Sequence, residues 1–353
     1  MELAFSARGI LERGKGLTFN DVLLVPQYSE ISSRREPVLR TDFTRNYQID
    51  IPVVTANMDT VTESEMVFAM SGLGGAGILH RFMSCEAQTD MVGKIKDYFK
   101  LKNISLPVVA SIGVKEDGKK RASLLVEAGT DILTIDIAHG DSIMMLETMK
   151  YVKKNYPGVD VIAGNVATAD GVKRMIDNGA DAVKVGIGPG SMCTTRIITG
   201  HGVPQMTAVS MCATEARKQG IPVIADGGIK TSGDIIKALA AGANCVMLGA
   251  MVSGTLETPG RVKHGKKCYR GMASKEAQVS WRGELPKGMA AEGESNMISC
   301  KGSVVDVIGE VIGGIRSGMT YMGVDRIEDM YEKALFMEMT PAGFLESRPH
   351  GLF

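Results

Sequence analysis

The chain has 353 residues, 44% of them hydrophobic, and its 40 basic and 40 acidic side chains cancel to a formal charge of zero. This composition can form a large core, and it lacks the basic excess typical of nucleic-acid-binding proteins. The first sixteen residues contain no apolar signal-peptide core, and no run of eighteen apolar residues indicates a membrane span. The six cysteines are scattered without a C-x-x-C pair, which argues against a structural zinc site. We therefore expect a soluble cytoplasmic protein.

The chain begins with an apolar entry segment, residues 17–26, and a polar stretch to about residue 48, which we interpret as an arm packed on the main fold. Short apolar runs follow, each succeeded by a helix-like segment. Strands that alternate with helices are typical of parallel βαβ units, and eight units close a TIM barrel. We predict an α/β fold, a (β/α)8 TIM barrel forming a single catalytic domain over residues 1–353. The eight runs are 51–55, 76–79, 106–111, 132–138, 160–163, 182–186, 222–225 and 245–249.

A weak internal repeat supports the barrel. Residues 128–133, 178–183 and 241–246 share one plan, in which a helix end is followed by a glycine, a short polar turn and a strand. The alternative is a doubly wound open sheet. A dinucleotide-binding sheet of that kind would carry G-x-G-x-x-G near its first strand, and the sequence has none there.

The sixth apolar run leads into the segment GIGPGSMCTTR, residues 186–196, which carries Cys193. Its glycines allow positive φ and close backbone approach to a ligand. Backbone N–H groups in such a loop can bind an anion and favour the thiolate, the nucleophilic form of cysteine. Cys193 is therefore a candidate nucleophile, and the alternative is a small buried hydrophobe beside an ordinary turn.

Polar residues and glycines also follow other predicted strands, where TIM barrels place their active sites. They are Asp136 to Gly140 after the fourth strand, Gly164-Asn165 after the fifth, Asp226-Gly227-Gly228 after the seventh and Gly249 after the eighth. Glycine-bearing turns after strands seven and eight commonly bind phosphate. We therefore expect a phosphorylated ligand.

A polar, glycine-rich stretch over about residues 275–302 shows no clear periodicity. Loops of this length in compact proteins are usually functional or disordered, so we predict a mobile flap that brings Glu292 over the cysteine. Residues 303–316 look helical again. The C-terminal tail, from Met339 onward, is predicted to be an extended arm.

Seven motifs, in this order, resemble those of the IMP dehydrogenase and GMP reductase family, over nearly the whole chain. The resemblance implies a barrel enzyme of purine nucleotide metabolism whose loop cysteine attacks carbon 2 of the purine and forms a covalent thioimidate. It makes Cys193 the nucleophile. The motifs are Asn57-Met58-Asp59-Thr60-Val61, Gly164-Asn165-Val166, GIGPGSMCTTR, Pro204-Gln205, Ala225-Asp226-Gly227-Gly228, Tyr269-Arg270-Gly271-Met272 and Gly314-Ile315-Arg316-Ser317.

The two branches of the family differ after this attack. Dehydrogenases pass hydride to NAD and hydrolyse the intermediate with an arginine that precedes a tyrosine on a long flap, and most carry a regulatory CBS insert after strand two. This chain lacks the Arg-Tyr pair, and only about 26 residues separate Leu79 from Leu106. The resemblance thus favours an NADPH-dependent GMP reductase, in which GMP yields IMP and ammonia. The alternative is an IMP dehydrogenase that oxidises IMP to XMP with NAD, with Arg282, beside Trp281, as a displaced flap arginine.

The resemblance also implies roles for individual residues. Cys193, Thr195 and Glu292 are the catalytic residues, and K⁺ binds the carbonyls of Gly188, Gly190 and Cys193. Family members are homotetramers. Asp136, with Asn165 and Arg81 as weaker candidates, lies near the nicotinamide. The substrate-binding set is Asp226 for the ribose, Ser191, Gly227, Gly228, Gly249 and Ala250 for the phosphate, and Gly271, Met272, Ser274 and Gly293 for the base.

Each of these roles has a structural alternative. Asp226 could cap the next helix, Thr195 could satisfy loop amides, and Glu292 could be one solvated carboxylate among many. Two other classes of function also stay open. One is a different phosphate-binding barrel, such as a flavin-dependent oxidoreductase, and the other is a catalytically silent nucleotide-binding module.

Overall fold

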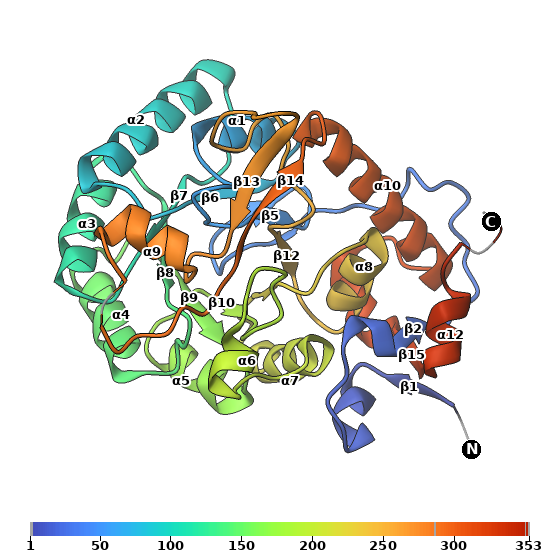
Figure 1. Ribbon diagram of the computed structural model, residues 1–353. Coiled ribbons are helices and arrows are strands. Elements are labelled where there is room, and N and C mark those ends of the chain that lie inside the picture. The colour runs from blue at the N-terminus through green and yellow to red at the C-terminus, as the bar shows by residue number, and fades with distance from the viewer. Residues whose placement is uncertain (1–2, 286, 350, 352–353) are drawn as a thin grey trace.

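The computed structural model describes residues 3–285, 287–349 and 351. At its centre, eight parallel strands form a closed barrel in which each strand pairs with the next along the chain and the last pairs with the first (Figure 1). All eight strands fall within or overlap the predicted apolar runs, so the predicted (β/α)8 barrel is confirmed. The strands are β5 (Val53–Thr55), β6 (Ala76–Leu79), β7 (Val109–Ile112), β8 (Ile132–Asp136), β9 (Asp160–Val166), β10 (Ala182–Val185), β11 (Val223–Asp226) and β12 (Cys245–Leu248).

Helices surround the barrel, as Figure 1 shows. In the predicted repeat, Gly129, Gly179 and Gly242 each follow a helix end with φ between 97° and 109°, a conformation that glycine adopts without strain. The surrounding helices are α1 (Ser64–Gly72), α2 (Cys85–Lys102), α3 (Glu116–Glu127), α4 (Ile143–Asn155), α5 (Ala169–Asp177), α7 (Gln205–Arg217), α8 (Ser232–Ala240) and α10 (Val304–Met322).

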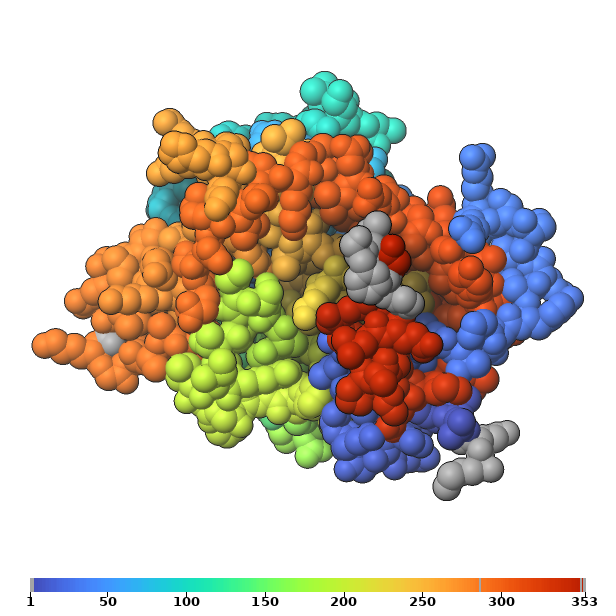
Figure 2. Space-filling model, turned by 45° about the vertical axis from the view of Figure 1, so that its right-hand side comes forward, coloured from blue at the N-terminus to red at the C-terminus, as the bar shows by residue number. Residues whose placement is uncertain are grey.

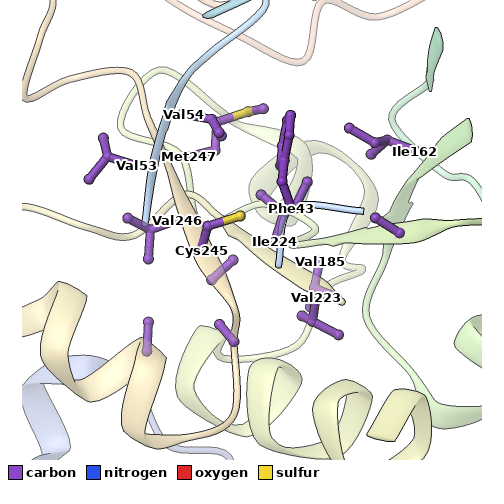
Figure 3. Packing of buried hydrophobic residues seen from close by; sticks show 14 of the residues in the cluster. Phe43, Val53, Val54, Ile162, Val185, Val223, Ile224, Cys245, Val246 and Met247 are labelled. Carbon is purple, nitrogen blue, oxygen red and sulfur yellow. The ribbon is translucent and has the colours of Figure 1, made fainter. Parts of the chain in front are cut away.

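A short hairpin, β3 (Thr41–Asp42) and β4 (Gln48–Ile49), covers the N-terminal end of the barrel. Its Phe43 is fully buried, and Figure 3 shows the ring among apolar side chains of several barrel strands. Thr44 donates a hydrogen bond to Asp160, the first residue of β9. Because this end is closed, the open end is the one where the strands finish.

The arm predicted at the N-terminus forms a three-stranded antiparallel sheet with a late segment of the chain. Its strands are β1 (Ala4–Ser6), β2 (Val22–Leu24) and β15 (Leu335–Glu338), with β15 in the middle. Figure 1 shows this sheet beside the barrel, near both ends of the chain. The short helices of the arm and of the segment before β15 are η1 (Arg8–Arg13), η2 (Phe19–Asp21), η3 (Ile327–Asp329) and α11 (Met330–Lys333).

Two predictions about the second half of the chain were wrong in part. The tail contains α12 (Pro341–Glu346), which Thr340 caps by accepting a hydrogen bond from the Gly343 N–H. The stretch 275–302 contains α9 (Lys275–Arg282) and β14 (Ser295–Ser299), and β14 pairs antiparallel with β13 (Lys266–Arg270). The partner strand of β14 lies outside the stretch, so periodicity within it could not reveal the pairing. Figure 2 shows this region, in orange, standing out on one side of the molecule.

Candidate active site

Three side chains form a hydrogen-bonded chain at the open end of the barrel. The Cys193 thiol donates to Oγ1 of Thr195 at 3.2 Å, and that hydroxyl donates to Oε2 of Glu292 at 2.8 Å. Thr195 is the first residue of the short helix α6 (Thr195–Thr199), whereas Glu292 comes from the connection between α9 and β14. The three residues predicted to be catalytic therefore meet, and a proton can pass between the thiol and the carboxylate through one hydroxyl.

The backbone holds Glu292 beside the cysteine loop. Its N–H donates to the carbonyl of Ala273 at 3.0 Å, and its carbonyl accepts from the N–H of Thr194 at 3.1 Å. Beside this hydrogen bond, Cys193 and Gly293 form an isolated antiparallel bridge. The cysteine loop and the flap are thus joined by main-chain hydrogen bonds, which explains why Glu292 is more than a solvated carboxylate.

The cysteine loop is also anchored to the end of β11. Gln205, the first residue of α7, donates from Nε2 to the carbonyls of Val185 and Asp226, at 2.9 and 3.1 Å. Gly186 has a φ of 150°, and a Cβ added there would lie 2.0 Å from the Asp226 carbonyl oxygen. Only glycine fits this position, so the close contact between the loop and β11 depends on it.

A cavity of about 260 Å³ lies between the cysteine loop, the ends of β11 and β12, and the flap. It is large enough to enclose a substantial part of a small ligand. Besides Cys193, Thr195 and Glu292, its lining includes eight residues predicted to bind substrate: Ser191, Asp226, Gly227, Gly228, Gly249, Ala250, Gly271 and Met272.

Two predicted substrate-binding residues lie outside this lining. The hydroxyl of Ser274 accepts a hydrogen bond from the Ala277 N–H at 3.2 Å and caps α9, and its side chain is fully buried. Gly293 bridges both Cys193 and Ser274. In this structure both residues join the flap to the loop.

In the structural alternatives, Asp226 caps the next helix and Thr195 bonds loop amides. The observed contacts of these two side chains are different. The N-cap of α8 is Thr231, which forms a capping box with Asp234, so Asp226 is not the cap. The Thr195 hydroxyl bonds the thiol and the carboxylate. Both side chains face the cavity.

Lys184 lies at the centre of a buried ionic cluster that the sequence analysis missed. Its Nζ is 2.8 Å from Oδ1 of Asp136 and 2.7 Å from Oδ2 of Asp226, and it also donates to Oδ1 of Asn165. Asn165 in turn donates from Nδ2 to Asp226 at 2.9 Å. A lysine inside the apolar strand Ala182–Val185 was the available signal, because lysine is almost never buried without a partner.

The cluster keeps Lys184 and Asp136 ionised. Burial alone would lower the pKa of Lys184, but the two carboxylates outweigh burial and raise it. Burial alone would raise the pKa of Asp136, but Lys184, together with Arg81 and Asn57, outweighs burial and lowers it. Lys184 and Asp136 therefore enter any reaction as an ammonium group and a carboxylate.

A second cavity, of about 320 Å³, adjoins the first. The three residues predicted to lie near a nicotinamide line it: Arg81, Asp136 and Asn165. The Nε atom of Arg81 is buried and has no hydrogen-bond partner among the described residues, which fits a site completed by a ligand. The two cavities share Ala56, Met58, Ala138, Asp226, Met247, Met272 and Ala273, so ligands in them would touch.

Tyr269 is a further cavity residue that sequence reasoning did not select. Its hydroxyl lies 3.2 Å from Oγ of Ser191, and burial raises its pKa. A Cβ at Gly249 would stand 3.1 Å from the same hydroxyl. Tyr269 thus fixes the spacing between the cysteine loop and the end of β12, from a strand that lies outside the barrel.

The described residues contain no group of three His, Cys, Asp or Glu side chains placed to hold a metal ion. The predicted K⁺ site would instead use backbone carbonyls, the oxygen donors that suit a hard monovalent ion. One of these, the Gly190 carbonyl, accepts a hydrogen bond from the Cys193 N–H at 3.0 Å and keeps a second lone pair. Among the described helices, none combines the length and apolar character that spanning a membrane requires.

Comparisons with known proteins agree on one family. The family model described as IMP dehydrogenase / GMP reductase domain matches residues 16–350. An inosine-5'-monophosphate dehydrogenase of Cryptosporidium parvum is 43% identical over 385 residues, covering 96% of this chain and 95% of that protein. The corresponding enzyme of Nitrosopumilus maritimus is 37% identical over 471 residues, covering 96% and 99%.

A solved structure is similar over almost the whole chain. It is a cysteine-to-alanine variant of GMP reductase from Trypanosoma brucei in complex with guanosine 5'-monophosphate. The two structures superpose with a TM-score of 0.91 at 34% identity, covering 96% of this chain and 98% of the other.

Proposed function

The chain belongs to the IMP dehydrogenase and GMP reductase family of oxidoreductases, and from this premise we propose that it is a GMP reductase, which converts GMP to IMP and ammonia with NADPH. The observation that carries the proposal is the Thr195 hydroxyl, which bonds both the Cys193 thiol and the Glu292 carboxylate. Loss of ammonia needs a group that first accepts a proton and then donates one, and this chain of three side chains supplies it.

In the first half of the proposed reaction, a proton moves along this chain of hydrogen bonds to Glu292 and then back. The Cys193 thiol passes its proton through Thr195 to Glu292, and the thiolate adds to carbon 2 of the purine. Glu292 then returns the proton through Thr195 to the amino group, which leaves as ammonia. Carbon 2 remains bonded to sulfur in a thioimidate.

The second half releases the product. NADPH, when bound, would supply the hydride that carbon 2 needs. Cleavage of the carbon–sulfur bond would then release IMP and leave Cys193 as a thiolate, which regains its proton. Asp136, Asn165 and Arg81 would hold the cofactor, because they line the cavity that adjoins the cysteine. Asp226 would bind the ribose hydroxyls, and the glycine-bearing turns with Ser191 would bind the phosphate.

One feature of the chain favours the reductase over the dehydrogenase. No Arg-Tyr pair occurs in the sequence, so the water-activating pair of the dehydrogenase branch is missing. Chain length does not separate the branches, because the Cryptosporidium parvum dehydrogenase aligns over only 385 positions. The alignment with the Nitrosopumilus maritimus dehydrogenase spans 471 positions against 353 residues here, so more than 100 positions have no counterpart in this chain. We propose that the regulatory CBS insert is among them.

An IMP dehydrogenase is the second candidate. The two similar sequences described above are both inosine-5'-monophosphate dehydrogenases. Arg282 of α9 lines the second cavity, where it would have to replace the missing water-activating arginine.

An absorbance assay of the nicotinamide run in both directions, with K⁺ present, separates the candidates. Loss of NADPH with release of ammonia from GMP, abolished in Cys193→Ala, is the expected result. Growth of NADH with XMP formed from IMP would replace the reductase by the dehydrogenase. A yellow, flavin-containing protein, or GMP binding without a reactive Cys193, would favour the two remaining alternatives.

Three accompanying properties are part of the same proposal. K⁺ would bind the carbonyls of Gly188, Gly190 and Cys193, so replacing it with Li⁺ should reduce turnover. The protein would be a cytoplasmic homotetramer. Light scattering of the purified chain measures the assembly directly.

A further inference from the structure

Two arginines line the second cavity without an acidic partner. Arg81 follows β6, and Arg282 ends α9 of the flap, so they come from two different elements. No described carboxylate forms an ion pair with either one, and Nε of Arg81 is buried with no hydrogen-bond partner. Buried guanidinium groups are normally paired, so the unpartnered Nε of Arg81 indicates a missing anion, whereas Arg282 is exposed at the edge of the cavity.

The nearby carboxylates are occupied by other cations. Asp136 is 2.8 Å from Lys184, and Asp117 is 3.3 Å from Arg121. Burial lowers the pKa of Arg81, and this effect exceeds the attraction of Asp136, which raises the pKa, while the charges of Arg121 and Arg282 lower it further. Arg81, Lys184 and Arg282 face the cavity against Asp136 and Asp226, so its lining carries an excess of one positive charge.

The fold holds Arg81 in place without an ion pair. The Arg81 guanidinium stacks 4.8 Å from the ring centroid of Phe82, and a Cβ at Gly113 would stand 3.3 Å from its Nη1, so glycine leaves room for it. Trp281, the neighbour of Arg282, meets the Phe82 ring edge-on at 6.1 Å. Phe82 therefore contacts both the Arg81 guanidinium and the residue that precedes Arg282.

The same cavity contains a second buried polar atom without a hydrogen-bond partner among the described residues. Gln278 of α9 donates from Nε2 to the Met272 carbonyl, while its Oε1 is buried and accepts no hydrogen bond from the described residues. The cavity thus offers guanidinium donors for an anion and an acceptor for a hydroxyl. A sugar phosphate carries both groups.

We propose that Arg81 and Arg282 form a clamp for a phosphate group of the nicotinamide dinucleotide, with Gln278 accepting from a ribose hydroxyl. This inference rests on the proposed function only in requiring a dinucleotide in this cavity. Because Arg282 belongs to the flap, binding of the phosphate would also hold α9 against the barrel.

Trp281 is the only tryptophan of the chain and lies beside the clamp, so its emission reports binding without turnover. Full-length wild type, Arg81→Gln and Arg282→Gln would be titrated with NADPH, NADH and inorganic pyrophosphate. Lys275→Gln is the matched control, because it removes one exposed charge from the same helix. We expect each arginine variant to weaken NADPH binding at least about tenfold, and the control to change it less than about twofold.

The three ligands identify the phosphate that is bound. Equal losses for NADPH and NADH, with competition by pyrophosphate, would assign the clamp to the pyrophosphate. A loss confined to NADPH would assign it to the 2'-phosphate. Wild-type affinity for NADPH in both arginine variants would overturn the clamp.

Melting temperatures separate the clamp from a structural role. In phosphate-free buffer, removing one of two mutually repelling arginines should leave the melting temperature unchanged or raise it, whereas pyrophosphate should stabilise only the wild type. A lower melting temperature with unchanged dinucleotide binding would mean that the arginines are structural. These readouts need no turnover, so a protein that proves to oxidise IMP would overturn the proposed reductase and still test the clamp, with NAD as the probe.

Discussion

The ammonium group of Lys184 lies 2.7 Å from a carboxylate oxygen of Asp226, inside the barrel and directly below the cavity that Cys193 borders. Asp136 approaches the same nitrogen at 2.8 Å from the neighbouring cavity. The Lys184 side chain is 3% exposed, so this cation is almost completely removed from water. One buried lysine therefore orients a carboxylate in each of the two cavities.

Replacing Lys184 with glutamine should strongly destabilise the protein. The variant keeps two carboxylates that are only 22% exposed and removes the charge between them, and breaking a buried ion pair in this way typically costs about 3–5 kcal/mol. Urea unfolding measures the loss. Lys173→Gln is the control, because Lys173 forms an exposed pair with Asp177 at 2.7 Å and its loss should leave stability almost unchanged. Equal losses of stability in the two variants would show that the cluster around Lys184 contributes little to the stability of the fold.

The same cluster predicts how stability depends on pH. The pKa of Asp136 is lowered in the folded protein, so its stabilising contribution is present above the ordinary value near 3.8 and is lost as pH falls through the folded value. The pKa of Lys184 is raised, so its contribution is present below 10.5 and is lost as pH rises through the folded value.

Lys184→Gln should reverse the way in which the stability of the protein changes when the pH is lowered. Without the ammonium group, burial raises the pKa of Asp136 and favours its protonated form, so lowering the pH from about 7 to about 5 should stabilise the variant relative to the wild type. Urea midpoints at the two pH values test this. A parallel decrease in both proteins would contradict the assigned charges.

The Thr195 hydroxyl should matter for catalysis more than for folding. Thr195→Val removes the link between Cys193 and Glu292 and should lower kcat by about 10²–10⁴-fold, while Thr195→Ser keeps a hydroxyl and should retain most of the activity. Steady-state kinetics and melting curves of the two variants provide the comparison. If valine and serine reduce kcat equally, the hydroxyl carries no proton.

Thiol chemistry should single out Cys193. Cys212 and Cys245 are fully buried, and burial raises the pKa of both thiols, so neither should react in the folded protein. We expect GMP to protect Cys193 from alkylation, as peptide mass analysis can measure. Cys300→Ala, at a partly exposed site outside the cavity, should leave this protection unchanged. Alkylation of Cys193 at the same rate with and without GMP would contradict its position in the substrate cavity.

The sequence predicted the barrel well because its strands are encoded locally. Each strand is a short apolar run between turn signals, and Gly129, Gly179 and Gly242 mark repeated ends of helices. The tail was predicted as extended, but Thr340 and Pro341 are a helix-starting pair, which is a local signal for α12. The β13–β14 pair has no such local signal, since it depends on strands far apart in the chain.

The site could be predicted from the sequence only where the residue types and the order of the motifs along the chain identify it. Cys193 and Glu292 were selected from their motifs, but their connection through Thr195 depends on main-chain pairing between the flap and the loop. Lys184 was treated as part of a buried strand, because its two carboxylate partners lie 48 and 42 positions away and only the closed barrel brings them together. A single sequence does not show which charged residues, far apart in the chain, pair in the folded protein.

Gly186 should be the most sensitive glycine of the cysteine loop. Gly186→Ala places a methyl group 2.0 Å from the Asp226 carbonyl oxygen at a φ of 150°, so the loop must move away from β11. We expect a loss of more than about 1 kcal/mol in stability and a larger loss in kcat, since the movement displaces Cys193 from Thr195 and Asp226 together. Gly200→Ala also lies at positive φ, but its Cβ would meet no atom within 4 Å, so it separates backbone strain from the clash. Equal kcat values for the two variants would show that close packing of the loop on β11 is unnecessary for the reaction.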